Sequence, residues 1–397
     1  MQNKDLQKYP TARFSPSMRK KKLPLLQKSL SNRLISWFSA HQRPLPWRQT
    51  TDPYLIWVSE IMLQQTQVAT VVPYFSRFIS RYPSVHHLAA APLEEVLSLW
   101  AGLGYYSRAT RLHRCAQFIC TYHNGRFPPT RTELMALPGI GRYTAGAIAS
   151  MAFGQSVPVL DGNVIRVLTR LLAISDNIGA PATHTRLWAI AEALVPVADA
   201  GTYNQAIMEL GATVCLPRHP RCSQCPVQDL CQARRRSLQS TLPVKTAAPR
   251  PRRSHCLAVV IEAAGKFLLL KRPPGGLWSS LWEFPTFHTP TSRSTEKHVL
   301  RIMERSLGLR VSVIRAIGPL RHQLTHRTFE YHIFHTRMKA APPQLLLPES
   351  DRGRYQDFAW VDTVAQRPCG TITRKIEQAI KAGQVVTARV PNGSANR

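Results

Sequence analysis

The chain has 397 residues, 44% of them hydrophobic, so it is long enough for two domains that each bury a core. Lysine and arginine outnumber aspartate and glutamate by 52 to 22, and the formal net charge of +30 predicts a polyanionic partner. No apolar stretch reaches membrane-spanning length and no secretory signal is present, so a membrane partner is not expected. Residues 1–30, with the basic run 19–22, are expected to form a basic N-terminal arm, unless translation starts at Met18.

Asp52-Pro53 is a helix-start signal and predicts a helix that begins at Pro53. This helix contains Glu60, and Trp57 and Leu63 lie three residues to either side of it. Such an apolar neighbourhood would raise the pKa of Glu60 and keep a proton available for donation. A solvent-exposed glutamate is the alternative.

Two short helices joined by a glycine-containing turn are predicted next. Thr130 and Glu133 form a capping box for a helix that ends at Leu137-Pro138-Gly139-Ile140-Gly141, and a second helix follows over residues 142–151. Gly139 and Gly141 allow a tight turn and the close approach of a phosphate to backbone amides. The pattern indicates a helix-hairpin-helix, and an ordinary turn between helices is the alternative.

Asp161 precedes another predicted helix, in the run Leu160-Asp161-Gly162. The apolar stripe of that helix consists of Val164, Val167, Leu168, Leu171 and Leu172. As an N-cap, Asp161 needs no catalytic role, but amide hydrogen bonds and the helix dipole would also keep it ionised to stabilise a positively charged sugar. Glu60 and Asp161 together supply the two carboxyl groups that glycosidic-bond cleavage requires.

Four of the eight cysteines cluster in the middle of the chain. They are Cys215, Cys222, Cys225 and Cys231, separated by six, two and five residues. Clustered thiols in a chain without a signal peptide indicate metal ligation rather than disulfides. Only the central pair has zinc-like spacing, so an iron–sulfur cluster is favoured over zinc.

The composition changes after residue 232. Residues 233–255 are rich in Arg, Pro and Ser and are expected to be a linker. Residues 256–380 are expected to form an α+β domain, and residues 381–397 a tail. Within the domain, strands are predicted over 256–263, 266–272, around 329–333 and over 357–361, with a helix near 297–307.

Several motifs together resemble the MutY family of adenine DNA glycosylases, within the helix-hairpin-helix glycosylase superfamily. They are VSEIMLQQTQVATV, GLGYYSRA, ALPGIGRYTAG, VLDGNVIRVL and the four-cysteine loop. The resemblance extends from about Leu34 to Asp362. It implies a multidomain fold: an all-α glycosylase domain over 31–232 with an iron–sulfur loop, followed by an α+β Nudix-like domain.

The resemblance also implies roles for individual residues. Glu60 would protonate the adenine ring and Asp161 would stabilise the oxocarbenium ion, with Tyr143 and Asn163 in support. Positions that would line the adenine pocket or contact DNA are Trp47, Arg48, Gln64, Gln65, Tyr105, Gly139, Gly141 and Gln205. Tyr105 matches the residue wedged into the base stack, where stacking on a base is worth about 1–3 kcal/mol.

Other functions are weighed against this one. A bifunctional glycosylase and lyase, as in endonuclease III, needs a lysine nucleophile, but no lysine lies between Lys28 and Lys245, and Tyr143 stands at the lysine position. A non-enzymatic zinc DNA-binding protein would leave Glu60 and Asp161 unexplained. We therefore expect a monofunctional adenine glycosylase.

The Nudix-like half is not expected to hydrolyse nucleotides, because its helix carries only Glu296 and Glu304 instead of a magnesium-binding glutamate cluster. In the family this domain recognises 8-oxoguanine through a Phe-Ser-His loop. This chain has Leu324-Thr325-His326 instead. Thr325 retains the hydroxyl, which can accept a hydrogen bond from the N7–H of the lesion. The aromatic ring is lost at Leu324.

The resemblance implies one 4Fe-4S cluster on the four cysteines and no nucleotide cofactor. The expected partner is double-stranded DNA with 8-oxoguanine:adenine or guanine:adenine mispairs, bound by a monomer. The cluster is expected to be structural and to position Arg218 and Arg221 against phosphate. In a bacterial cell the protein would be cytoplasmic and associated with the nucleoid.

Overall fold

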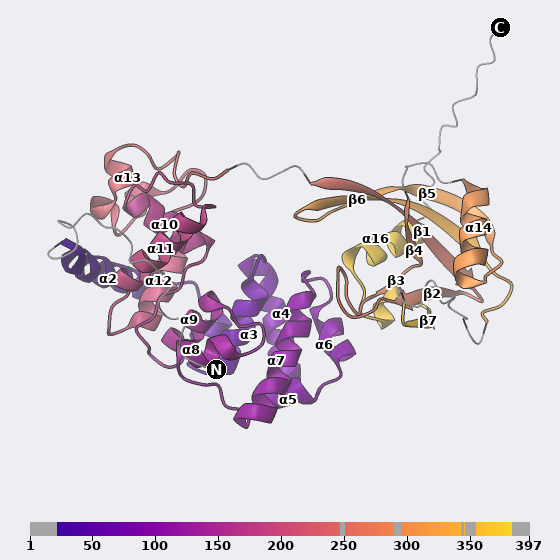
Figure 1. Cartoon of the computed structure of the whole chain (residues 1–397), viewed down its shortest axis with the longest axis horizontal. Coiled ribbons are helices and arrows are strands. Elements are labelled where there is room, and N and C mark those ends of the chain that lie inside the picture. Colours follow the sequence, from indigo (N-terminus) through magenta and orange to yellow (C-terminus); the bar gives the residue numbers. More distant parts are fainter. Residues whose placement is uncertain (1–21, 247–250, 290–294, 343–344, 346–354, 383–397) are drawn as a thin grey trace, which may run out of the picture. The chain divides into compact units, whose positions relative to one another are not determined.

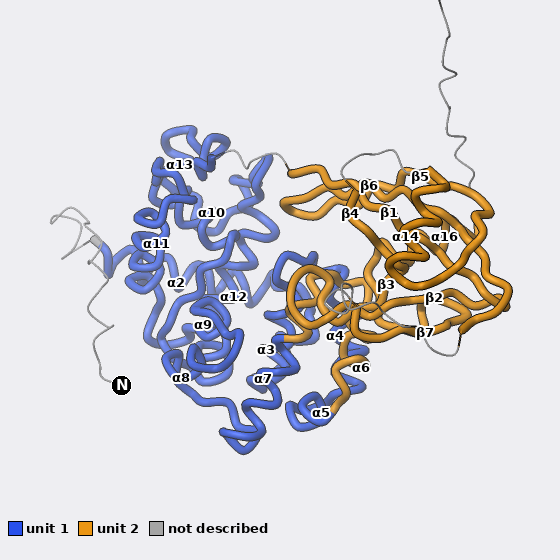
Figure 2. Tube along the Cα trace, turned by 45° about the vertical axis from the view of Figure 1, so that its right-hand side comes forward, with its two compact units in different colours: residues 1–90, 111–247 blue, residues 91–110, 248–397 orange. Residues whose placement is uncertain are grey.

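The computed structural model describes residues 22–246, 251–289, 295–342, 345 and 355–382. The chain divides into two compact units, coloured separately in Figure 2. The first comprises residues 1–90 and 111–247, and the second comprises 91–110 and 248–397. The second unit therefore includes residues 91–110, which lie in the helical half of the sequence.

The described part of the first unit is helical (Figure 1). In chain order its elements are α2 (Lys22–His41), η1 (Pro46–Arg48), α3 (Pro53–Leu63), α4 (Val68–Arg81), α5 (Val85–Ala90), most of α7 (Ser107–His123), α8 (Arg131–Ala136), α9 (Arg142–Met151), α10 (Gly162–Leu171), α11 (Pro181–Leu194), α12 (Ala200–Thr213), η2 (Cys222–Gln224), η3 (Gln228–Leu230) and α13 (Gln232–Arg235). This agrees with the all-α domain predicted from the sequence.

One core of this unit forms where α2, α10, α11 and α12 pack together. Val164, Val167, Leu168 and Leu171 of the predicted apolar stripe are buried in this core, together with Leu34 and Phe38 of α2 and Ile207 of α12. Leu172, which directly follows α10, is partly buried against it. α12 approaches α10 closely at Gly211, where an added Cβ would lie 2.6 Å from the Cβ of Asn163. Any larger residue at 211 would displace Asn163, which follows Asp161 by two positions.

The folded helical part extends beyond the expected limits of 31 and 232. α2 begins at Lys22, and Leu23 and Leu26 pack against the core, because apolar residues directly follow the basic run that suggested an arm. Residues 1–21 lie outside the described part of the chain. At the other end, the backbone carbonyl of buried Leu242 accepts a hydrogen bond from Arg170 Nε at 2.9 Å. The expected linker over 233–255 is therefore partly packed on the helices.

The second unit contains a seven-stranded sheet. Its elements are α6 (Leu93–Trp100), the start of α7, β1 (Arg252–Ala263), β2 (Lys266–Lys271), β3 (Trp282–Glu283), β4 (Thr286–Thr289), α14 (Glu296–Leu307), β5 (Ser312–Gln323), β6 (Arg327–Arg337), β7 (Asp357–Val361), η4 (Val364–Gln366) and α16 (Thr371–Lys381). The main strand order is β3-β2-β1-β6-β5, with β4 paired to β1 and β7 to β2. β1 and β6 are parallel, and the remaining pairs are antiparallel.

Helices cover both faces of this sheet, so β1 is buried on both sides. Cys256, Ala258 and Val260 belong to the core that includes α16, whereas Leu257, Val259 and Ile261 belong to the core that includes α14. Alternation of side chains along a strand explains this division. The α+β prediction and its strands over 256–263, 266–272, 329–333 and 357–361 are confirmed.

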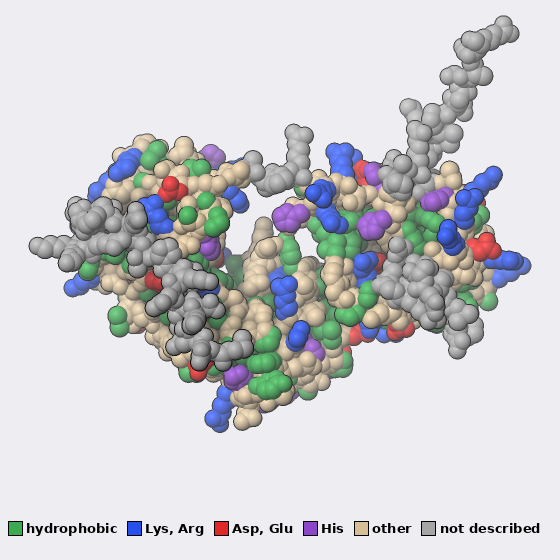
Figure 3. Space-filling model, in the orientation of Figure 1, with side chains coloured by type: hydrophobic (Ala, Val, Ile, Leu, Met, Phe, Trp, Pro, Cys, Tyr) green, Lys and Arg blue, Asp and Glu red, His purple; other side chains and the backbone are tan. Residues whose placement is uncertain are grey.

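The surface is basic, as the composition predicts. On the face drawn in Figure 3, Lys and Arg side chains are spread over both units and acidic side chains are sparse. Among the described residues, no helix is long and apolar enough to cross a membrane.

Candidate active site

Glu60 lies on α3, whose start is fixed by Asp52, because Asp52 Oδ1 accepts a hydrogen bond from the Tyr54 amide at 2.8 Å. The Glu60 side chain is buried, and its Oε2 accepts a hydrogen bond from the Tyr143 hydroxyl at 2.6 Å. Burial raises the pKa of Glu60 to about 7, against the opposing effect of the Tyr143 hydrogen bond. The expected burial of Glu60 is confirmed, and the solvent-exposed alternative is wrong.

Asp161 is the N-cap of α10. Its Oδ1 accepts a hydrogen bond from the Val164 amide at 2.7 Å, and its Oδ2 accepts one from Asn163 Nδ2 at 2.9 Å. The expected hydrogen bonds are therefore present, but their effect on the pKa is outweighed. Burial raises the pKa of Asp161 above its ordinary value, because desolvation disfavours the carboxylate more than the two donors stabilise it.

Both carboxyl groups line one cavity of about 480 Å³ in the first unit. Of the residues expected at the adenine pocket or DNA, the cavity is lined by Trp47, Gln64, Gln65 and Gln205. Tyr143 and Asn163, expected to support the two carboxyl groups, line it as well. Ser59, Met208 and Glu209 also line it. The cavity has both polar and apolar walls, as a site for a planar heterocycle requires.

Arg48 does not line this cavity and instead joins an ion cluster around the buried Glu209, which the sequence analysis missed. Glu209 accepts hydrogen bonds of 2.7 Å from Arg48 Nη2, from Arg43 Nε and from Arg43 Nη2. Burial alone would raise the pKa of Glu209, but the two arginines hold it down at about 2. The sequence feature that could have drawn attention to Glu209 is that it is the sole charged residue of α12.

The predicted helix-hairpin-helix is present in α8, the turn over 137–141 and α9. Thr130 caps α8 by accepting a hydrogen bond from the Glu133 amide at 3.2 Å. Gly139 has a φ of +83°, and an added Cβ would lie 3.3 Å from the Cβ of Arg111. Gly141 caps α9, and nothing lies within 4 Å of a Cβ added there. The exposed turn therefore leaves space for a ligand beside the backbone amides of α9.

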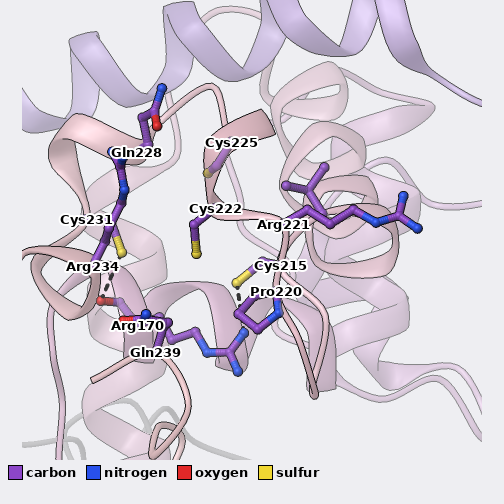
Figure 4. Close-up of a pocket in the computed structure, with 11 residues that line it drawn as sticks. Arg170, Cys215, Pro220, Arg221, Cys222, Cys225, Gln228, Cys231, Arg234 and Gln239 are labelled. Atoms are coloured by element: carbon purple, nitrogen blue, oxygen red, sulfur yellow. Dashed lines mark hydrogen bonds between the residues drawn. The ribbon is translucent and has the colours of Figure 1, made fainter. Parts of the chain in front are cut away.

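The four clustered cysteines line one small cavity of the first unit, and Figure 4 shows their sulfur atoms facing a common space. Among the described residues, no three His, Cys, Asp or Glu side chains are close enough to hold a single metal ion. A cluster of several iron atoms is larger than one ion, so its thiolates lie farther apart. Burial raises the pKa of Cys225 to about 12, and bound iron would offset the cost of its thiolate. These thiols fit an iron–sulfur cluster.

Two arginines of α10 hold the cysteine loop. Buried Arg170 donates to the carbonyl of Leu216 at 2.7 Å and to Cys215 Sγ at 3.4 Å. Arg166 Nε donates to the carbonyl of Cys215 at 2.7 Å, and Arg166 Nη2 donates to Asn163 Oδ1 at 2.9 Å. A continuous hydrogen-bonded path therefore runs from Asp161 through Asn163 and Arg166 to Cys215.

The remaining predicted residues lie in the second unit. Leu324 packs against the sheet core, whereas Thr325 and His326 are exposed at the turn between β5 and β6. Tyr105, also exposed, has a φ of +49°, and its hydroxyl lies 3.2 Å from Thr325 Oγ1. The predicted wedge and the predicted lesion-recognition loop are therefore in contact.

Comparison with known proteins agrees with this arrangement. The HhH-GPD superfamily of base excision DNA repair proteins matches residues 58–193, the iron–sulfur binding domain of endonuclease III matches 215–231, and the NUDIX domain matches 256–379. The cysteine loop is therefore an iron–sulfur binding loop.

Two relatives and one solved structure illustrate the similarity. Adenine DNA glycosylase of Homo sapiens is 38% identical over 380 residues, covering 82% of this chain and 70% of the relative. The Mus musculus enzyme is 36% identical over 379 residues, covering 82% and 74%. The structure of a thermostable thymine-DNA glycosylase is 29% identical, with a TM-score of 0.48, covering 54% of this chain and 98% of that one. The chain therefore belongs to the adenine DNA glycosylases, the MutY-type enzymes of DNA base excision repair.

Proposed function

We propose that this glycosylase is monofunctional and removes adenine paired with 8-oxoguanine or guanine in double-stranded DNA. The observation that supports the proposal most directly is that two carboxyl groups, buried Glu60 and half-buried Asp161, line the same cavity. Burial raises the pKa of both groups, that of Glu60 to about 7, so Glu60 is partly protonated at neutral pH. At Asp161 the rise is opposed by hydrogen bonds from the Val164 amide and from Asn163 and by the charge of Arg166, all of which favour the carboxylate. One group can thus be the acid while the other is a carboxylate.

In the proposed reaction, the adenine leaves the base stack and enters this cavity. Protonated Glu60 donates its proton to an adenine ring nitrogen, and the electron pair of the N-glycosidic bond leaves with the adenine. The carboxylate of Asp161 stabilises the positive charge that develops on the sugar. Water then adds to the sugar carbon, and its released proton returns to a carboxylate, so that the products are adenine and an abasic site.

Tyr143 and Asn163 would keep these carboxyl groups in position. The Tyr143 hydroxyl donates to Glu60 Oε2, which leaves the other oxygen of Glu60 available to the adenine. Asn163 Nδ2 and the Val164 amide both donate to Asp161, and they would hold its carboxylate toward the sugar. Neither tyrosine nor asparagine offers an amine, so the site supports hydrolysis rather than Schiff-base chemistry.

The iron–sulfur group would be a 4Fe-4S cluster held by Cys215, Cys222, Cys225 and Cys231. When bound, it cross-links a loop that has little regular structure of its own. Within that loop Arg218 and Arg221 are exposed and can contact phosphate. Because hydrolysis transfers no net electrons, its proposed role is to shape this DNA-binding surface.

Recognition of the base opposite adenine is assigned to Thr325, His326 and Tyr105. A hydroxyl at 325 can accept a hydrogen bond from the N7–H that distinguishes 8-oxoguanine from guanine. Leu324 is packed against the sheet core, so it supports the turn and offers no ring to the DNA.

The test is to incubate the full-length protein with duplexes that contain 8-oxoguanine opposite adenine, guanine opposite adenine, 8-oxoguanine opposite cytosine, or thymine glycol opposite adenine. Strands are analysed with and without hot alkali. We expect alkali-dependent scission at adenine in the first two duplexes, faster in the first. Strand breakage at thymine glycol without alkali, or a covalent adduct trapped by borohydride, would overturn the monofunctional assignment.

A further inference from the structure

Residues 91–110 belong to the helical half by sequence, but they are part of the second unit, where they contact the sheet (Figure 2). The contact is made by α6 through Glu94 in its first turn. Glu94 Oε2 accepts a hydrogen bond from Lys271 Nζ at 3.1 Å. Its Oε1 accepts from Arg367 Nη1 at 2.9 Å and from Trp282 Nε1 at 3.1 Å. One carboxylate therefore joins α6 to three separate segments of the sheet domain.

The three residues that donate hydrogen bonds to Glu94 also contact one another or neighbouring backbone. Lys271 and Trp282 are paired across β2 and β3, and the Arg367 guanidinium lies 4.9 Å from the centroid of the buried Trp282 ring. Trp282 also donates its amide to the carbonyl of Pro368 at 2.9 Å. Burial alone would raise the pKa of Glu94, but the hydrogen bonds from Lys271 and Arg367 lower it. Glu94 is thus a carboxylate at neutral pH.

A second contact follows the helix. The Tyr106 hydroxyl donates to the carbonyl of Cys369 at 3.0 Å and accepts from the Gly102 amide at 3.2 Å. Cys369 pairs with Trp282 in a β-bridge, so Glu94 and Tyr106 reach the same part of the sheet domain. The loop over residues 101–106 lies between these two contacts in the sequence.

The loop presents Tyr105 in a conformation that is unfavourable for a residue with a side chain, because its φ is +49°. Contacts made by Trp100 and Arg108 hold the backbone and the ring of Tyr105 in this conformation. Arg108 Nη2 and Trp100 Nε1 both donate to the carbonyl of Gly104 at 3.1 Å. The Arg108 guanidinium lies 5.3 Å from the centroid of the Tyr105 ring. The position of Tyr105 therefore depends on the surroundings of the loop.

We infer that Glu94 and Tyr106 are positioning residues that fix the loop over 101–106 to the sheet domain, so that Tyr105 and Thr325 engage DNA as one element. This inference rests on the proposed function of Tyr105 and Thr325. Neither positioning residue lines the adenine cavity. Their loss should therefore weaken discrimination of the opposite base more than it slows adenine excision as such.

The test uses full-length Glu94→Ala, Glu94→Gln and Tyr106→Phe, with Glu304→Gln as the control. Glu304 is an exposed glutamate of α14 whose partner Arg310 is 3.5 Å away and exposed. Single-turnover rate constants are measured on duplexes with adenine opposite 8-oxoguanine and opposite guanine. We expect Glu94→Ala and Tyr106→Phe to lower the ratio of the two rate constants by about three- to tenfold. Glu94→Gln should cause a smaller loss, because the amide oxygen still accepts from Trp282, and the control should match the wild type.

A second readout does not depend on activity. Hydrogen–deuterium exchange of the amides over 102–106 should be faster in Glu94→Ala and Tyr106→Phe than in the wild type and the control. An unchanged ratio with unchanged exchange would overturn the inference. Equal losses on both duplexes together with a lower melting temperature would also overturn it, because they would indicate a purely structural role. Failure of the wild type to excise adenine from either duplex would instead overturn the proposed function.

Discussion

The hydrogen bond from Tyr143 lowers the pKa of Glu60, but the pKa remains above its ordinary value. The carboxyl group is buried on α3, and this burial sets the direction of its pKa. The Tyr143 hydroxyl works in the opposite direction and also fixes one carboxyl oxygen. A group with a pKa of about 7 is partly protonated at neutral pH, which suits proton donation to a base.

Replacement of Glu60 by glutamine should remove this acid while keeping the hydrogen bond from Tyr143. We expect the single-turnover rate constant of Glu60→Gln to fall by about 10²–10⁴-fold. In the wild type, the rate constant should fall as the pH rises through about 7, because the protonated form is lost. Measurement of rate constants between acidic and mildly alkaline pH on one mispaired duplex tests both expectations.

The same substitution, which should lower activity, should raise the stability of the folded protein at neutral and higher pH. Because the folded-state pKa of Glu60 lies above its ordinary value of 4.5, folding is disfavoured by this group once the pH exceeds 4.5, and the full cost is reached above about 7. Glu60→Gln should therefore raise the melting temperature at pH values above about 7 and have little effect in acid. A variant that is inactive and also less stable above neutral pH would contradict this account.

At the scale of elements, α10 connects the candidate active site to the iron–sulfur loop. Asp161 caps its first turn, Asn163 lies in that turn, and Arg166 one turn later reaches the carbonyl of Cys215. The helix is itself fixed by its apolar stripe in the core. A disturbance of the cysteine loop can therefore reach Asp161 through two side chains and one helix.

Arg166→Met should break this connection while keeping the length of the apolar stem. We expect roughly tenfold slower excision, since Asn163 loses a charged hydrogen-bond donor, and weaker retention of the cluster, since the Cys215 carbonyl loses the same donor. Iron content and visible absorbance per protein report on the cluster, independently of activity. Arg186→Met on α11 is the control, because Arg186 is exposed and pairs only with exposed Asp176 among the contacts described. Normal iron content and activity in Arg166→Met would refute the connection.

At the scale of the whole molecule, the sequence predicted much of the fold because local signals agreed with tertiary packing. Asp52-Pro53, Thr130 with Glu133, and Asp161 each mark a helix start, and each side chain makes the expected capping hydrogen bond. The strands of the sheet followed from alternation and from runs that are buried on both faces.

What the sequence did not reveal depends on contacts between distant residues. Glu209 lies 166 positions from Arg43, and no local pattern links them. Glu94 contacts Lys271, Trp282 and Arg367, and such a set emerges only when the chain is folded. The sequence also did not predict that the pKa of Asp161 is raised, because its burial depends on tertiary packing and cannot be inferred from its position as a helix cap.

The net charge of +30 makes one prediction that concerns the whole surface. Basic proteins release counterions when they bind DNA, and one that contacts about 6–10 phosphates loses roughly 10³–10⁵-fold in affinity between about 50 and 200 mM salt. We expect this loss for mispaired and undamaged duplexes alike, so the preference between them should change little with salt. Phosphate contacts carry no sequence information, whereas the preference depends on short-range contacts to bases.

Fluorescence anisotropy with the Glu60→Gln variant allows this measurement without turnover. Adding Arg218→Gln and Arg221→Gln should reduce the slope of log Kd against log salt by about two, because each exposed arginine would neutralise one phosphate. Arg186→Gln, on α11, changes the charge outside the cysteine loop and should leave the slope unchanged. An unaltered slope after replacement of both arginines would show that the loop lies away from phosphate. The iron–sulfur loop would then act on Asp161 through Arg166 alone.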